Sequence, residues 1–172
     1  MIFKKGERNF QNLLFYLGNK EIKIVNGYTY QGIRFTRSGL FCEAAEQIAS
    51  KSNIASLSTL SLINRSGIYS LGTVIKLFNS LVESVSLYGC EVWSVSYLDH
   101  LIRIQSKFFK SFLFLPTCSP HYAVRFEMQL DSIECKVLKL ILNWIAKILK
   151  MGVERFPKAL LFELFAIDSD YG

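Results

Sequence analysis

The chain has 172 residues, of which 51% are hydrophobic and 20% charged, and its formal net charge is +6. This length supports one domain with a real core, and the apolar content excludes an intrinsically disordered chain. No window of about 20 uncharged apolar residues occurs and charges at Lys4, Lys5 and Glu7 interrupt any early apolar run, so we expect neither a membrane span nor a secretory signal.

The first 37 residues read as short β-strands and are strongly basic, with seven Lys/Arg against two acids. Residues 2–5 (IFKK) read as the end of a strand. Residues 14–25 contain two short strand-like runs around the turn signal Gly18-Asn19. Aromatic and β-branched residues crowd residues 28–35 (YTYQGIRF), which predicts a strand. Strands this short are marginal alone, so we expect them to belong to a larger sheet.

From Phe41 onward the sequence predicts helix after helix. The expected helical segments are 41–64, 71–88, 97–115, 121–128 and 132–150, and a short apolar segment from Pro157 precedes a polar tail over 168–172. The apolar positions that indicate the first helix are Ala44, Ala45, Ile48, Ala49, Ile54, Leu57 and Leu60. The expected fold class is α+β, mostly α, with short N-terminal antiparallel strands followed by a helical bundle. The expected units are 1–38, 39–156 and 157–172.

Two of these helical segments carry basic stripes. The first stripe has spacings of four and three and would share one helix face opposite the apolar stripe: Arg103, Lys107 and Lys110. The second lies on the long helix: Lys136, Lys139, Lys147 and Lys150. Each stripe is either the solvated face of an amphipathic helix or a surface that contacts phosphates. A further alternative is that residues 132–150 lie on a membrane surface.

No pattern of residues predicts an active site. Cys118 and His121 form a C-x-x-H step, but zinc requires a second close ligand pair that the sequence lacks. Asp168-Ser169-Asp170 is the only close aspartate pair, and it reads as a solvated tail without the rigidity that a two-metal site needs. We therefore expect no catalytic residue, no metal and no cofactor in this chain.

The cysteines are expected to be reduced thiols with no disulfide partner, because they are widely spaced and follow no secretory signal. They are Cys42, Cys90, Cys118 and Cys135. We therefore expect an intracellular protein, nuclear or cytoplasmic, that is not secreted.

Several segments, taken in order, resemble the C-terminal part of the reverse transcriptase of non-LTR (LINE-type) retrotransposons. These segments are FKKG (3–6), YTYQGIRFTRSGLF (28–41), LFNSLVESVSLYGCEVW (77–93), LIRIQSKFFKSFLFLP (101–116), VRFEMQL (124–130) and WIAKILKM (144–151). Each is weakly specific alone, and their order and spacing, which cover nearly the whole chain, carry the resemblance. It implies a fragment of an RNA-directed DNA polymerase from a transposable element, comprising the end of the palm and the thumb.

The resemblance also implies roles for individual residues. Tyr30, Gln31 and Gly32 are similar to the primer-grip strand, which holds the primer end near the catalytic metals. The helices from Phe41 onward are similar to the thumb, which packs along the template–primer duplex. The nucleic-acid-binding candidates are Arg34, Arg37, Arg103, Lys107, Lys110, Lys136, Lys139 and Lys147.

The sequence departs from the family at two positions and lacks the family's catalytic core. Gln31 stands where the family usually has Leu, and Gln129 where it usually has Gly. The metal-binding aspartates of the family lie in upstream strands that this chain does not contain, so Mg²⁺ is expected only in the intact polymerase. The expected partners are an RNA/DNA primer–template and the missing palm and fingers, with no membrane. The alternative is a stand-alone, non-enzymatic, nucleic-acid-binding helical domain.

Overall fold

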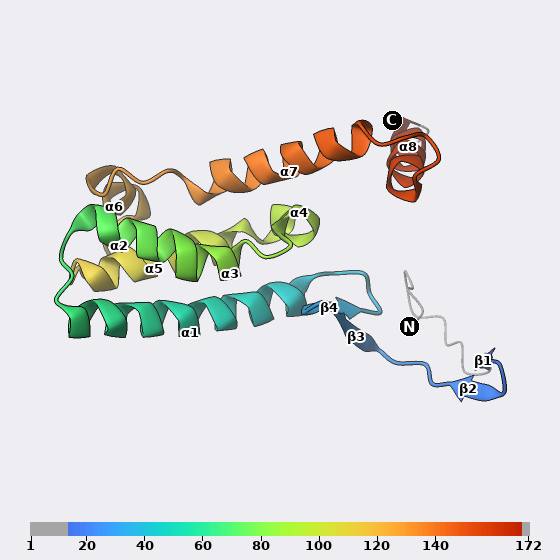
Figure 1. Cartoon of the computed structure of the whole chain (residues 1–172), viewed down its shortest axis with the longest axis horizontal. Coiled ribbons are helices and arrows are strands. Elements are labelled where there is room, and N and C mark those ends of the chain that lie inside the picture. The colour runs from blue at the N-terminus through green and yellow to red at the C-terminus, as the bar shows by residue number, and fades with distance from the viewer. Residues whose placement is uncertain (1–13, 170–172) are drawn as a thin grey trace.

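The chain folds as two small β-hairpins followed by a helical bundle, as shown by a computed structural model that describes residues 14–169 (Figure 1). This arrangement confirms the predicted fold class, α+β and mostly α. The strand expected over residues 2–5 lies outside the described residues. None of the helices in the described range is both long and apolar enough to cross a bilayer.

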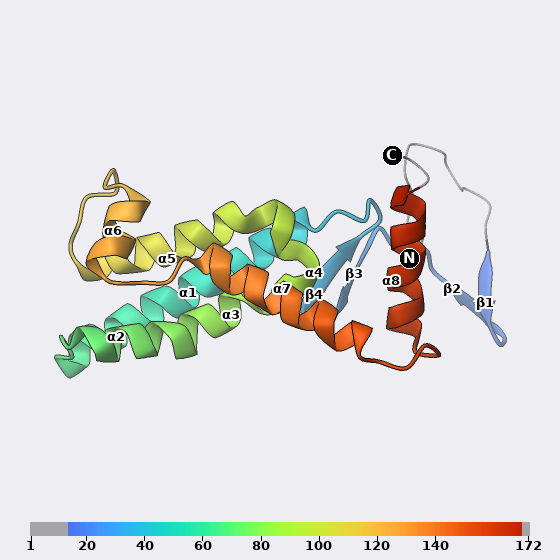
Figure 2. The same ribbon diagram turned by 90° about the horizontal axis from the view of Figure 1, so that it is seen from above.

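The first hairpin pairs β1 (Phe15–Leu17) with β2 (Lys20–Ile22) around the predicted Gly18-Asn19 turn. All of its residues are exposed, and it lies away from the helices (Figures 1 and 2). The second hairpin pairs β3 (Gly27–Tyr30) with β4 (Ile33–Thr36). The expected larger sheet does not form within residues 14–169, because the two hairpins remain separate two-stranded sheets.

Three helical rods lie side by side and enclose the core. The first is α1 (Cys42–Ser66), which ends at Gly67 in the left-handed conformation. The second is a continuous rod made of α2 (Leu71–Leu77), the π-helical segment η1 (Phe78–Glu83) and α3 (Ser84–Ser86). The third is α5 (Leu98–Phe112). Phe78 packs against Phe108 and Phe109 with ring centroids 4.9 Å apart in each pair, which joins the second rod to the third.

The apolar positions of α1 differ in burial along the helix: Ala44, Ala45 and Ile48 are buried, whereas Ile54 and Leu57 are 65% and 66% exposed. Small polar residues occupy the interface instead: Ser52, Ser56 and Thr59. Each hydroxyl donates to the carbonyl four residues earlier at 2.8 Å, so burial leaves no unsatisfied hydroxyl on this face. Small side chains allow a close approach of α1 and α5, which large residues at positions 52, 56 and 59 would prevent.

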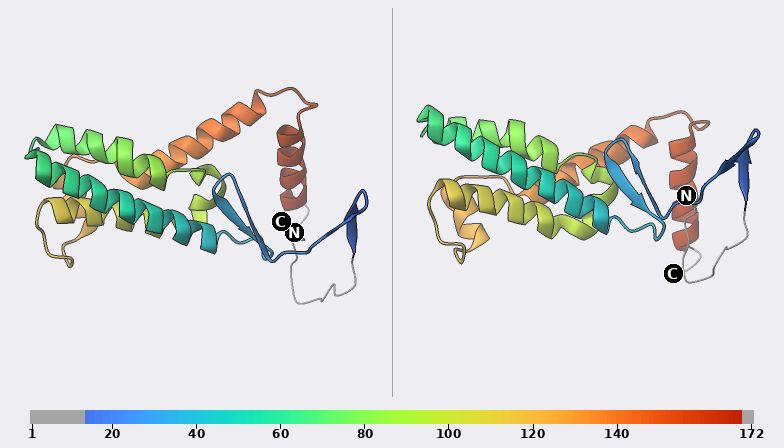
Figure 3. Two further views of the ribbon diagram at one scale, coloured as in Figure 1. Left: turned by 60° about the horizontal axis from the view of Figure 1, so that its bottom comes forward. Right: turned by 90° about the horizontal axis from the view of Figure 1, so that it is seen from below.

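Shorter elements connect and cover the rods. They are α4 (Cys90–Trp93), the 3₁₀ turn η2 (Ser94–Tyr97), α6 (His121–Glu127), α7 (Ile133–Leu149) and α8 (Phe156–Ser169). Helix α7 crosses over α4 and α5, and α8 stands across the end of α7 (Figures 1 and 3). Helix α8 extends through Asp168 and Ser169, the first two residues of the expected polar tail.

Candidate nucleic-acid interface

The segment YTYQGIRF forms a tight hairpin and not the single strand predicted over Tyr28–Phe35. Tyr30 pairs with Ile33, so the loop between the strands contains only Gln31 and Gly32. Both residues have positive φ, 47° and 80°, which is the pattern of a type I′ turn. Glycine adopts this conformation freely, whereas Gln31 does so at a steric cost. The sequence signal for this turn was Gly32 between two runs of strand-forming residues.

The turn is fixed to the helical body by residues that follow α3. The hydroxyl of Tyr88 donates to the carbonyl oxygen of Gln31 at 2.8 Å. The indole Nε1 of the buried Trp93 donates to the carbonyl oxygen of Tyr88 at 3.1 Å, which holds Tyr88 in place. Gly89 has φ 61°, and a Cβ there would lie 2.6 Å from Cδ1 of Ile33. The sequence YGCEVW therefore positions the hairpin as well as closing a corner of the core.

Replacing Tyr88 with Phe is expected to loosen the hairpin without unfolding the helices. The change removes one hydrogen bond to Gln31, worth about 1 kcal/mol. Amide hydrogen exchange of β3 and β4 should become about fivefold faster, while exchange in α1 and α5 stays unchanged. Tyr69→Phe, at an exposed tyrosine, is the matched control. Equal exchange rates in the two variants would show that the hydroxyl does not hold the turn.

The two arginines of the hairpin region, Arg34 and Arg37, make contacts within the fold. Nε of Arg34 lies 2.7 Å from Oε2 of Glu43 in the first turn of α1, in an ion pair whose side chains are both about half exposed. Arg37 follows β4 and is half-buried, and its backbone N–H donates to Asn26 at 2.8 Å. Arg34 thus contributes to the docking of the hairpin on α1.

The loop that follows α5 covers one residue of its basic stripe and leaves the other two exposed. Arg103 and Lys107 are exposed. Lys110 is only 7% exposed, and its Nζ donates to the carbonyl oxygen of Thr117 at 2.9 Å. The prediction that all three residues share one solvent face is therefore wrong for Lys110. Its apolar stem is covered while its ammonium group reaches the loop, as long basic side chains often do.

The basic stripe on α7 likewise contains both an ion-paired lysine and exposed lysines. Nζ of Lys136 lies 2.9 Å from both carboxylate oxygens of Glu83, a buried residue of η1, so Lys136 joins α7 to the second rod. Lys139 and Lys147 are exposed. The exposed surface of this helix also carries large apolar side chains at four positions: Leu138, Leu142, Trp144 and Leu149.

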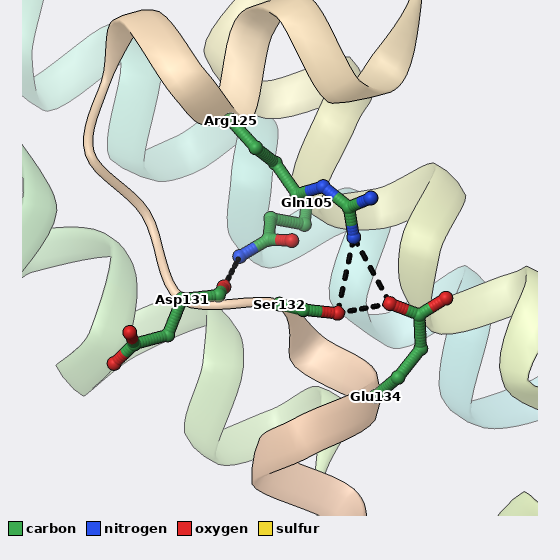
Figure 4. A network of polar contacts seen from close by, with 5 residues as sticks. All are labelled: Gln105, Arg125, Asp131, Ser132 and Glu134. Atoms are coloured by element: carbon green, nitrogen blue, oxygen red, sulfur yellow. Dashed lines mark hydrogen bonds and ion pairs between the residues drawn. The ribbon is translucent and has the colours of Figure 1, made fainter.

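A polar network that the sequence did not reveal joins α5, α6 and α7 (Figure 4). Nη1 of Arg125 donates to the hydroxyl of Ser132 at 3.1 Å and to Oε2 of Glu134 at 3.0 Å, and the Ser132 hydroxyl donates to the same carboxylate oxygen. The Ser132 hydroxyl and the Arg125 guanidinium lower the pKa of the Glu134 carboxyl, although desolvation opposes them. Nε2 of Gln105 donates to the carbonyl oxygen of Asp131 at 3.2 Å. The network fixes the entry into α7.

The remaining reactive side chains are dispersed. Cys118 and His121 are both exposed, and residues 14–169 contain no group of three or more His, Cys, Asp or Glu that could hold a metal ion. All four cysteines are free thiols. Burial, with a smaller contribution from Glu91, raises the pKa of the Cys90 thiol to about 12, so this thiol stays protonated.

Comparisons with protein families, characterised proteins and solved structures find no match to this chain.

Proposed function

We propose that this chain is the part of a non-LTR retrotransposon reverse transcriptase that grips the primer–template, comprising the end of the palm and the thumb. The main support is the docking of the Gln31-Gly32 turn on the helical body through Tyr88. A primer grip must hold one strand end at a fixed place relative to the helices that hold the duplex. A tight turn bonded directly to the helical bundle meets this requirement.

The charge on the helices supports contact with a phosphate backbone. Arg103 and Lys107 lie one helical turn apart on the exposed side of α5, and neither takes part in an ion pair within residues 14–169. Cations that are free of acidic partners can replace the counterions of a nucleic acid, which is the main source of affinity for a duplex. Lys139 and Lys147 on α7 are further candidates of the same kind.

The exposed apolar side chains of the first hairpin support a missing neighbour. Five residues in and beside β1 and β2 are each at least 45% exposed: Leu14, Phe15, Tyr16, Leu17 and Ile22. An isolated two-stranded hairpin is marginal in water, and exposed strand edges readily pair with another chain. In the proposal the palm of the intact polymerase covers this hairpin and supplies the aspartates that bind Mg²⁺.

Binding of a primed RNA–DNA duplex tests the proposal. By fluorescence anisotropy, affinity is expected to fall steeply with salt, and Arg103→Ala/Lys107→Ala is expected to reduce the slope of log K against log[salt] by about 2. The control is Arg65→Ala/Lys76→Ala, which removes the same charge from exposed sites on α1 and α2. The proposal would be contradicted if the duplex did not bind at low salt, or if both double variants reduced the salt slope equally.

The alternative, a stand-alone nucleic-acid-binding domain, is separated by the choice of nucleic acid. A primer grip should prefer a duplex with a recessed 3′ end over a blunt duplex of the same length, whereas a domain that reads only the backbone should not. Adding dNTPs and Mg²⁺ to the recessed duplex tests the proposal that this chain does not polymerise alone. Extension of the primer by the purified chain would show that it polymerises without a palm.

A further inference from the structure

Lys110 carries a buried positive charge whose partner in the fold is neutral. The residue is 7% exposed, and its Nζ donates to the carbonyl oxygen of Thr117. None of the ion pairs formed within residues 14–169 includes Lys110. An ammonium group has three N–H donors, and the Thr117 carbonyl accepts from one of them. An anion placed beside Nζ would supply a counter-ion and accept a charge-assisted hydrogen bond.

A pocket of about 340 Å³ lies where this ammonium group is found. Arg103 and Lys107 line it from the exposed side of α5, and Thr117 and His121 from the loop after α5 and the first residue of α6. None of the lining residues is an aspartate or a glutamate. The pocket therefore gathers three basic side chains and the hydroxyl-bearing residues Ser111 and Thr117 around a space that is open to solvent.

We propose that this pocket binds the phosphoryl group of a nucleotide. Arginine and lysine form their strongest hydrogen bonds with phosphate oxygens, and Lys110 is already held in place by Thr117. The volume lies at the lower end of small-ligand sites, about 300–1,000 Å³, which is larger than a phosphate alone requires. Leu115 supplies an apolar wall for the remainder of the nucleotide.

The nucleotide has two possible sources, a free nucleoside phosphate or the terminal phosphate of a strand. Assignment to a strand rests on the proposed function, because the pocket includes Arg103 and Lys107, which would contact the primer–template. The bond between Lys110 and Thr117 also closes the loop after α5. The test must therefore separate binding of an anion from this structural role.

The experiment measures binding of four probes to the full chain by calorimetry. The probes are inorganic phosphate, dAMP, and a short single-stranded oligonucleotide with and without a 5′-phosphate, and deoxyadenosine is the uncharged reference. Phosphate-bearing probes are expected to bind. The double variant Arg103→Gln/Lys107→Gln is expected to weaken the affinity for dAMP at least about tenfold. Both substituted side chains are exposed, so this variant should fold even if Lys110→Met does not. The matched control is Lys76→Gln, at an exposed lysine of α2 outside the pocket.

Comparison of the probes distinguishes the two possible ligands. Tighter binding of the 5′-phosphorylated oligonucleotide than of dAMP supports a strand end as the ligand, and the reverse order supports a free nucleotide. The inference is overturned if dAMP binds no better than deoxyadenosine and the 5′-phosphate adds nothing, or if Lys76→Gln weakens binding as much as the pocket variant. Duplex binding without nucleotide binding overturns only this inference. Nucleotide binding without duplex binding overturns only the proposed function.

Discussion

Phe78→Ala is expected to lower the free energy of unfolding by about 3–5 kcal/mol, the usual cost of truncating a fully buried phenylalanine. Phe78 has no exposed surface and stands between Phe108 and Phe109, which are themselves 5.1 Å apart. Removing its ring leaves a cavity where the second and third rods meet. Because this cluster joins the rods, the loss should appear as a fall in the stability of the whole bundle.

Urea unfolding followed by circular dichroism measures this loss, with Phe126→Ala as the matched control. Phe126 is 85% exposed in α6, so the same chemical change there should alter stability by no more than about 0.5 kcal/mol. A similar midpoint for both variants would mean that the three rings do not form the core of the bundle.

Lys136→Met is expected to cost about 2–3 kcal/mol, because it leaves the carboxylate of Glu83 buried without its counter-ion. The Lys136 side chain is about one quarter exposed, so this figure lies below the range for a fully buried pair. Lys139→Met, on the same helix at an exposed position, should be nearly neutral. Thermal or urea unfolding of the two variants gives the comparison.

A double-mutant cycle identifies the pair as the cause. Adding Glu83→Gln to Lys136→Met removes the stranded charge, so the double variant should be more stable than the sum of the two single losses predicts. Strict additivity would contradict a direct interaction between η1 and α7.

The sequence predicted the helices well because their apolar and small residues recur at helical spacing. It located α1, α5, α6 and α7 to within a few residues. Periodicity did not distinguish the buried apolar positions of α1, such as Ala45 and Ile48, from the exposed Ile54 and Leu57. Ser52, Ser56 and Thr59 are buried in the same helix, with hydroxyls that donate to carbonyls within it. Close helix packing therefore overrode side-chain hydrophobicity.

The candidate site was predicted less completely, because its contacts join residues distant in sequence. Tyr88 meets Gln31 across 57 positions, and Lys136 meets Glu83 across 53. No local pattern encodes such pairs. Residue spacing placed Lys110 on the α5 stripe but could not show that the loop at Thr117 folds over it. The chemical types of the site residues were thus readable from the sequence, and their partners were not.

The π-helical segment η1 bears on how the chain tolerates a change in length. Each i→i+5 turn holds more residues than an i→i+4 turn, so the rod from Leu71 to Ser86 contains one residue beyond a regular α-helix. Deleting exposed Asn79 would let this stretch relax to α-helix and keep Tyr88 under the hairpin. The same deletion within α2 would rotate all that follows by about 100° and carry Tyr88 away from Gln31. Helix η1 is therefore the part of the second rod where one residue can be lost while the distance and orientation between core and hairpin are preserved.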